Sequence, residues 1–164
     1  MKILFNFQDI YSSYSTDVYR FALWLSGDRD EAEDITSKTF VRALIRKSAI
    51  RTETLKAYLF TIARHVYLER LRKEKNQAPL MYDHPDPAPE PDQIVEFRSQ
   101  LRRIQQILRL FPETDRTAFI LRVHLELPYA EIARILELSL SAVKVKVHRI
   151  RKKLIADCLD KEVF

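Results

Sequence analysis

Apolar residues recur every three or four positions along most of this chain, which is the spacing of helices that bury one face. The recurrence predicts helices over residues 7–26, 28–46, 54–75, 94–110, 113–126, 128–137 and 140–157. The second helix has a start signal, because Asp28 can cap its first turn and Glu31 stands three residues later. The chain has a single glycine, a residue that sheets use in tight turns. The pattern therefore predicts an all-α fold.

The predicted helices carry apolar stripes that we expect to form the core. The stripes of the first half are Ala32, Ile35, Phe40, Ala43 and Leu44, followed by Leu55, Leu59, Ile62 and Val66. The first stripe of the second half is Phe97, Leu101, Ile104, Leu108 and Phe111.

A proline-rich acidic segment separates the two halves. Five prolines fall within residues 78–92, and residues 76–97 hold five acidic residues and neither Lys nor Arg. Proline at this density cannot continue a helix and favours extended, solvated backbone. We therefore predict two small helical domains, residues 1–75 and 94–164, joined by a linker over residues 76–93. An ordered surface loop is the alternative. We expect the two domains to be loosely coupled.

The segment Pro128–Leu154 has the pattern of a helix-turn-helix. Ile132, Ala133 and Leu136 face inward on a short helix, and Ser139 can cap the helix that follows the turn. The second helix buries one stripe, formed by Val143, Val147, Ile150 and Leu154.

The rest of that second helix is cationic. No acidic residue occurs between Glu137 and Asp157, and the exposed positions carry Lys144, Lys146, His148, Arg149, Arg151, Lys152 and Lys153. A helix with one apolar stripe and a cationic surface, preceded by a short helix and a turn, is typical of a recognition helix in the major groove. The alternative is a solvated basic face. The combination of charge and turn favours duplex DNA.

Composition narrows the function classes further. The net charge of +5 is compatible with nucleic acid, and the single cysteine, Cys158, excludes an internal disulfide and a thiolate metal cluster. The scattered histidines give no metal-ligand pair, and no glycine-rich phosphate loop is present, so we expect no catalysis, cofactor or metal. No signal peptide or membrane-spanning run is evident, which indicates a cytoplasmic protein without membrane insertion.

Two sets of motifs resemble extracytoplasmic-function (ECF) sigma factors, over nearly the whole chain apart from the linker. Residues 27–43 (GDRDEAEDITSKTFVRA) and 57–73 (AYLFTIARHVYLERLRK) resemble sigma region 2. Residues 110–123 (LFPETDRTAFILRV), 127–139 (LPYAEIARILELS) and 142–154 (AVKVKVHRIRKKL) resemble sigma region 4. The resemblance implies core RNA polymerase, promoter DNA and an anti-sigma factor as partners, and a monomer when free.

The resemblance also implies roles for particular residues. Duplex minus-35 contacts fall to Lys144, Val145, Lys146, His148, Arg149, Arg151, Lys152 and Lys153. Single-stranded minus-10 contacts fall to Arg46, Lys47, Arg51, Lys56, Tyr58, Arg64, His65 and Tyr67, and polymerase contacts to Asp34, Ser37, Lys38 and Arg42. Val145 either touches a thymine methyl or packs on a neighbour, and Tyr58 either stacks on a base or belongs to the core.

Several residues depart from the family pattern. Ser37 and Lys38 stand where Gln and Glu are usual, Tyr58 replaces Trp, His65 replaces Asn, and Glu137 replaces the Gly of the turn. The alternative functions are a conventional helix-turn-helix regulator and an adaptor that binds only polymerase or another regulator and does not touch DNA. Residues 1–75 distinguish a sigma factor from the conventional regulator, because only a sigma factor needs polymerase binding and strand capture.

Overall fold

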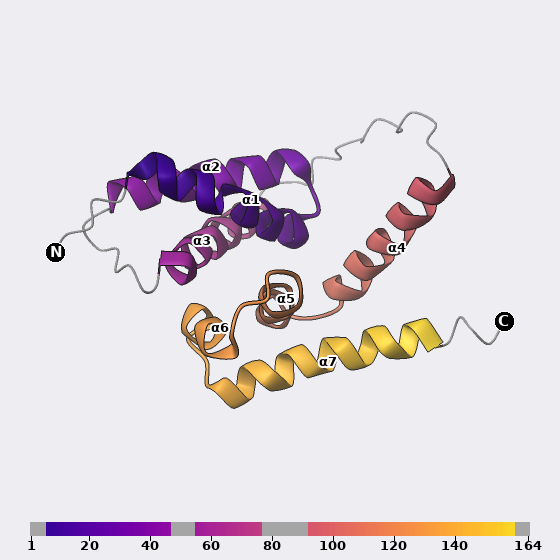
Figure 1. The fold of residues 1–164 in the computed structure, drawn as a ribbon. Coiled ribbons are helices and arrows are strands. Elements are labelled where there is room, and N and C mark those ends of the chain that lie inside the picture. The colour runs from indigo at the N-terminus through magenta and orange to yellow at the C-terminus, as the bar shows by residue number, and fades with distance from the viewer. Residues whose placement is uncertain (1–5, 47–54, 77–91, 160–164) are drawn as a thin grey trace.

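The computed structural model describes residues 6–46, 55–76 and 92–159, and these residues form helices and connecting turns only. The helices are α1 (Phe7–Ser26), α2 (Arg29–Ile45), α3 (Leu55–Lys75), α4 (Asp92–Arg109), α5 (Glu113–Phe119), the π-helix η3 (Ile120–His124), α6 (Tyr129–Leu136) and α7 (Leu140–Leu159). The predicted all-α fold is confirmed. Figure 1 shows α1, α2 and α3 gathered together, α7 on the opposite side, and α5 and α6 between them.

The first three helices form a bundle around aromatic residues. Phe21 of α1, Phe40 of α2 and Phe60 of α3 are at most 2% exposed, and the rings of Phe21 and Phe60 meet edge to face at 5.2 Å. The bundle's first turn is tight because Gly27 adopts the left-handed conformation with φ 73°, which glycine tolerates without strain. As predicted, Asp28 caps α2, and its Oδ1 accepts a hydrogen bond from the Glu31 amide at 2.8 Å.

Two predictions about the helices are wrong. Leu44 is not part of the α2 core stripe, because its side chain is 45% exposed near the end of the helix. The helix predicted over residues 113–126 is not uniform. It widens after Phe119 into the π-helix η3, closed by the Leu125 amide bonding to the Ile120 carbonyl, and Glu126 then takes the left-handed conformation with φ 56°.

The proposed linker falls mainly outside the described residues. Residues 77–91 are not described, and α4 begins at Asp92, two residues earlier than predicted and inside the segment assigned to the linker. Aspartate is favourable in the first turn of a helix, because its charge complements the positive end of the helix dipole.

The helix-turn-helix forms with glutamate in place of glycine. Glu137 takes the left-handed conformation with φ 54°, its amide bonds to the Arg134 carbonyl, and the Leu138 amide bonds to the Ala133 carbonyl at 3.0 Å. These two bonds define a Schellman ending of α6. Ser139 then caps α7 as predicted, since its Oγ accepts from the Ala142 amide at 3.2 Å. The turn therefore stands where it was expected, with a strained residue at its centre.

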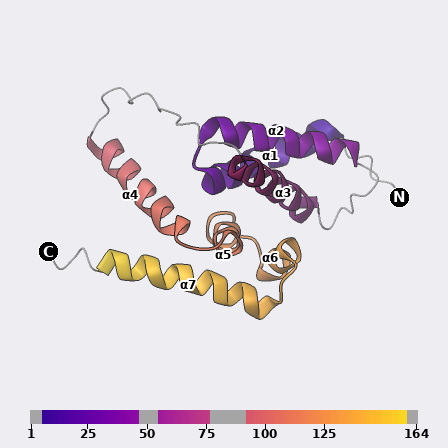
Figure 2. The same ribbon diagram turned by 180° about the vertical axis from the view of Figure 1, so that it is seen from behind.

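The two halves of the chain pack against each other, which differs from the expected loose coupling. Arg64 of α3 forms two 2.8 Å hydrogen bonds to Glu113 of α5, and the Tyr67 hydroxyl accepts a hydrogen bond from Arg116. Trp24 of α1 meets His124 of η3 with ring centroids 5.0 Å apart. Seen from behind in Figure 2, α5 and α6 again lie between the first three helices and α7.

Candidate nucleic-acid interface

The recognition helix α7 is anchored by the predicted stripe. Val143, Val147 and Ile150 are at most 1% exposed, and Leu154 is half-buried against the same core. Ile132 and Leu136 of α6 are buried beneath it, while Ala133 is half-buried. Because this stripe fixes one side of α7 to the domain, the opposite side must face outward.

The outward side of α7 combines cations with one apolar residue. Lys144, His148, Arg149, Arg151 and Lys152 are exposed, as is Lys153, which also lies 3.1 Å from Asp157. Val145 is 49% exposed. It does not pack on a neighbour as a core residue would, so the structure favours its availability to a ligand.

Two shallow grooves flank Val145. One of about 280 Å³ is lined by Ser141, Ala142, Val145, Lys146 and Arg149. The other, of about 440 Å³, is lined by Tyr129, Lys144, Val145, His148, Arg149 and Arg151. A helix surface that places an apolar group between cations suits a DNA groove, where phosphates flank base edges and thymine methyls.

Tyr129 and Arg122 belong to this surface although sequence reasoning missed them. The Arg122 guanidinium lies 4.6 Å from the centre of the Tyr129 ring, and the Lys144 ammonium lies 5.8 Å from it. Arg122 also donates a hydrogen bond to the Leu127 carbonyl at 3.1 Å. The Tyr129 ring thus lies within cation–π distance of both Arg122 and Lys144. The signal available in the sequence was an aromatic residue directly after Pro128, at the start of the helix packed on α7.

A second candidate surface lies between α2 and α3. A groove of about 640 Å³ is lined by Arg42, Ile45, Arg46, Ile62, His65, Leu68, Glu69 and Arg72. It brings together Arg46 and His65, which were predicted to contact the minus-10 strand, and Arg42, which was predicted to contact polymerase. Glu69 and Arg72 also line this groove, on the same face of α3 as His65, although no motif in the sequence singled them out.

Arg42 is held within this groove by an ion pair. Its guanidinium donates to both Glu69 carboxylate oxygens, at 3.0 and 2.7 Å. These hydrogen bonds lower the pKa of Glu69 and raise that of Arg42, so both side chains stay charged near neutral pH. Since both are well exposed, the pair contributes little to stability and can exchange partners.

The other residues predicted to hold the minus-10 strand lie in different surroundings. Lys56 is 3.6 Å from Asp17, and Tyr58 is half-buried against the core with its hydroxyl buried. Tyr67 is 3% exposed, and Arg64 is held by Glu113. In this arrangement neither Tyr67 nor Arg64 can contact a DNA strand. Lys47 and Arg51 lie outside the described residues.

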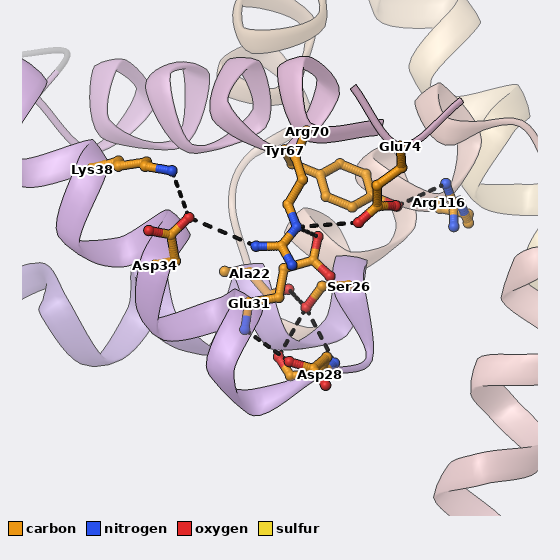
Figure 3. Close-up of polar contacts among 10 residues, drawn as sticks. All are labelled: Ala22, Ser26, Asp28, Glu31, Asp34, Lys38, Tyr67, Arg70, Glu74 and Arg116. Carbon is orange, nitrogen blue, oxygen red and sulfur yellow. Dashed lines mark hydrogen bonds and ion pairs between the residues drawn. The ribbon is translucent and has the colours of Figure 1, made fainter. Parts of the chain in front are cut away.

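The residues predicted to contact polymerase lie along α2. Ser37 and Lys38 are exposed, and Lys38 pairs with Asp34 at 2.7 Å. Figure 3 shows Arg70 of α3 reaching into this acidic region, where it lies within 3.7 Å of Glu31, Asp34 and Glu74. Burial is the main cause that raises the pKa of Glu31, assisted by the neighbouring carboxylates and opposed by Arg70. Arg70 therefore locks α2 to α3 beneath the predicted polymerase face.

Other kinds of site are not evident in the part of the chain that the structure describes. It holds no group of three or more His, Cys, Asp or Glu side chains arranged to bind a metal. None of its helices has both the length and the apolar character needed to cross a membrane.

Comparison with known proteins defines the class. Residues 10–77 match the family model described as sigma-70 region 2, and residues 101–154 match the one described as sigma-70, region 4. These matches, in this order, are those of a sigma factor, a class of non-enzymatic transcription initiation factors.

Individual relatives narrow the class to a family. The ECF RNA polymerase sigma factor SigM of Bacillus subtilis is 31% identical over 151 residues, which cover 89% of this chain and 91% of SigM. The RNA polymerase sigma factor YlaC of the same organism is 28% identical, over 94% of this chain and 92% of YlaC. This chain therefore belongs to the ECF RNA polymerase sigma factors, as the sequence motifs indicated, and the alternative of a conventional regulator is not supported.

A solved structure shares the fold. The sigma factor RpoE of Bartonella quintana, crystallised with the anti-sigma factor NepR, matches with a TM-score of 0.71 over 90% of this chain and 93% of that one. The two sequences are 24% identical, so the likeness concerns the fold.

Proposed function

We propose that this ECF sigma factor reads the minus-35 element as duplex DNA with the outward face of α7. The observation that carries this proposal is the exposed array around Val145, in which cations flank one apolar group on an otherwise anchored helix. Lys144 and Arg149 are the candidates for base edges, with Val145 for a thymine methyl. Arg151, Lys152 and Lys153 are the candidates for phosphate contacts, which position the helix without specifying sequence.

The groove between α2 and α3 is proposed to take the melted minus-10 strand. It offers Arg46 and Arg72 as cations, and His65 as a flat side chain able to stack. The adjoining outer face of α2, with Asp34, Ser37, Lys38 and Arg42, is proposed to bind core polymerase. Arg64 can join strand capture only after Glu113 releases it, so we propose that the two domains separate when polymerase binds.

Control by an anti-sigma factor is a further part of the proposal. RpoE of Bartonella quintana was crystallised with such a partner, and its fold matches over both regions. We propose a cytoplasmic protein without catalytic activity, since polymerisation chemistry would belong to the core enzyme. The domain boundaries are proposed as residues 1–75, 76–93 and 94–164.

The first experiment is transcription from genomic fragments by core RNA polymerase, with and without this protein. We expect new, defined start sites that share upstream elements. Sequence-specific duplex binding without new starts would instead indicate a conventional regulator, and absence of both would indicate an adaptor.

The promoter found in this way tests the residue assignment. The double variant K144A/R149A should lose at least tenfold in promoter-dependent initiation, because each good base contact is worth about 1–3 kcal/mol. The matched control R29A/R102A removes two exposed cations, one from the start of α2 and one from α4, which line neither proposed DNA surface, and should initiate normally. Equal activity of both double variants would contradict the proposal.

A further inference from the structure

A buried carboxylate lies directly beneath the recognition helix. Asp115 of α5 has a side chain that is 1% exposed, and its Oδ1 lies 2.7 Å from the Lys146 ammonium. Its Oδ2 is buried without a hydrogen-bond donor in the described residues, and the Arg149 guanidinium lies 3.8 Å from it. Isolated buried carboxylates are strongly disfavoured, so α5 presents a charge that α7 must neutralise.

Lys146 and Arg149 both face Asp115, but they differ in how exposed their side chains are to solvent. Lys146 has a side chain that is 20% exposed, and its ammonium is held at hydrogen-bond distance in the interior. Arg149 is 62% exposed, and its guanidinium is attracted at a distance too long for a hydrogen bond. Because Lys146 and Arg149 are three residues apart, they stand on the same side of α7. Lys146 is therefore committed to the domain interior, while Arg149 stays available at its edge.

We propose that Asp115 is a positioning residue for minus-35 recognition, which holds α7 through Lys146 and orients the Arg149 guanidinium toward the DNA. This inference rests on the proposed function of α7. It reassigns Lys146, which the sequence placed among the DNA contacts, to an internal bridge. A side chain that is already oriented loses less freedom on binding, so orientation by Asp115 raises the affinity contributed by Arg149.

The test uses holoenzyme and the promoter found by transcription, with affinity measured over a series of salt concentrations. D115N keeps the shape of the side chain and removes its charge. We expect D115N to weaken promoter binding about tenfold in the wild-type background, because the bridge and the orientation of Arg149 are both lost. In the R149A background we expect D115N to have much less effect. An equal loss in both backgrounds would indicate a merely structural role and overturn the inference.

Lys146 gives a second test that does not depend on the folding of D115N. K146Q should leave the slope of log affinity against log salt unchanged, whereas its matched control K152Q should reduce the slope by about one phosphate contact. K146R should retain wild-type affinity, since it keeps the bridge to Asp115. A slope reduced by K146Q as much as by K152Q would show that Lys146 contacts phosphate, and would overturn the inference.

The variants distinguish a failure of the proposed DNA-binding function of α7 from a failure of the positioning role of Asp115. If K144A/R149A holoenzyme binds the promoter as wild type does, the proposed function of α7 fails and this inference fails with it. If that double variant is defective, but D115N binds the promoter with wild-type affinity and K146Q reduces the salt slope as much as K152Q does, only the positioning role of Asp115 is refuted.

Discussion

The contact between the two domains includes one buried ion pair, Arg64–Glu113, and Glu113→Gln removes its charge with little change of shape. Arg64 and Glu113 have side chains that are 14% and 15% exposed, and two hydrogen bonds of 2.8 Å join them. Thr117 donates a third bond to Glu113, at 2.6 Å. Burial alone would raise the pKa of Glu113, but the hydrogen bonds from Arg64 and Thr117 outweigh it and lower that pKa.

The expected effect of E113Q follows from this burial. Removing one partner of a buried ion pair costs about 3–5 kcal/mol, because the other charge stays buried without compensation. Because Arg64 keeps some solvent access, we expect E113Q to destabilise the closed form by about 3 kcal/mol. Opening the interface lets Arg64 return to water, so E113Q should raise the ratio of open to closed molecules on the order of a hundredfold.

Trp24 makes this shift measurable, because it is the chain's only tryptophan and its ring contacts His124 of the other domain. We expect E113Q to move the Trp24 emission to longer wavelength and to enlarge the radius of gyration measured by X-ray scattering. The matched control is E69Q, which breaks a similar two-bond arginine pair inside the first domain and should change neither signal. Wild-type emission and radius in E113Q would refute the proposition that this pair holds the domains together.

Further expectations concern pH, the turns and Val145. Burial and nearby Arg20 lower the pKa of His124, so protonation of His124 favours the open form. The Trp24 contact should therefore weaken as pH falls below about 6.5, and H124Q should remove this pH dependence. Glu113 has a lowered pKa, so its contribution is complete above about pH 4.3 and is lost as pH falls through the lowered value; E113Q should lack that acid transition. Glu137→Gly should raise the free energy of unfolding by about 1 kcal/mol in urea titrations, and Glu126→Gly should raise it by a similar amount, because each substitution relieves the strain of a left-handed conformation. A lower free energy of unfolding in either variant would contradict this strain. Val145→Ser should weaken promoter binding about threefold to tenfold while leaving the melting temperature unchanged, since the side chain is 49% exposed.

Periodicity predicted the helices well because each helix buries a regular stripe. Val143, Val147 and Ile150 are buried as their spacing required, and the bounds of α1 are as predicted. The interface between the domains had no such signal. Arg64 and Glu113 are 49 residues apart, and neither interrupts the pattern of its own helix. The π-helix was missed for a related reason, since an apolar run such as Phe119–Leu121 does not distinguish a wide turn from a regular one.

The cationic face of α7 shows how far the sequence could go in assigning individual residues. Successive residues of an α-helix are rotated by about 100°, so Lys146 and Lys153 lie roughly 70–90° from the centre of the buried stripe, whereas Val145 and Lys152 lie nearly opposite it. The structure places Lys146 on Asp115 and Lys153 on Asp157, and leaves Val145 and Lys152 exposed. Lysines at the margin of a buried stripe can thus reach acidic groups of their own domain. Their angular position was readable in the sequence, but the carboxylate that engages Lys146 was not, because it comes from α5 and meets α7 only in the folded domain.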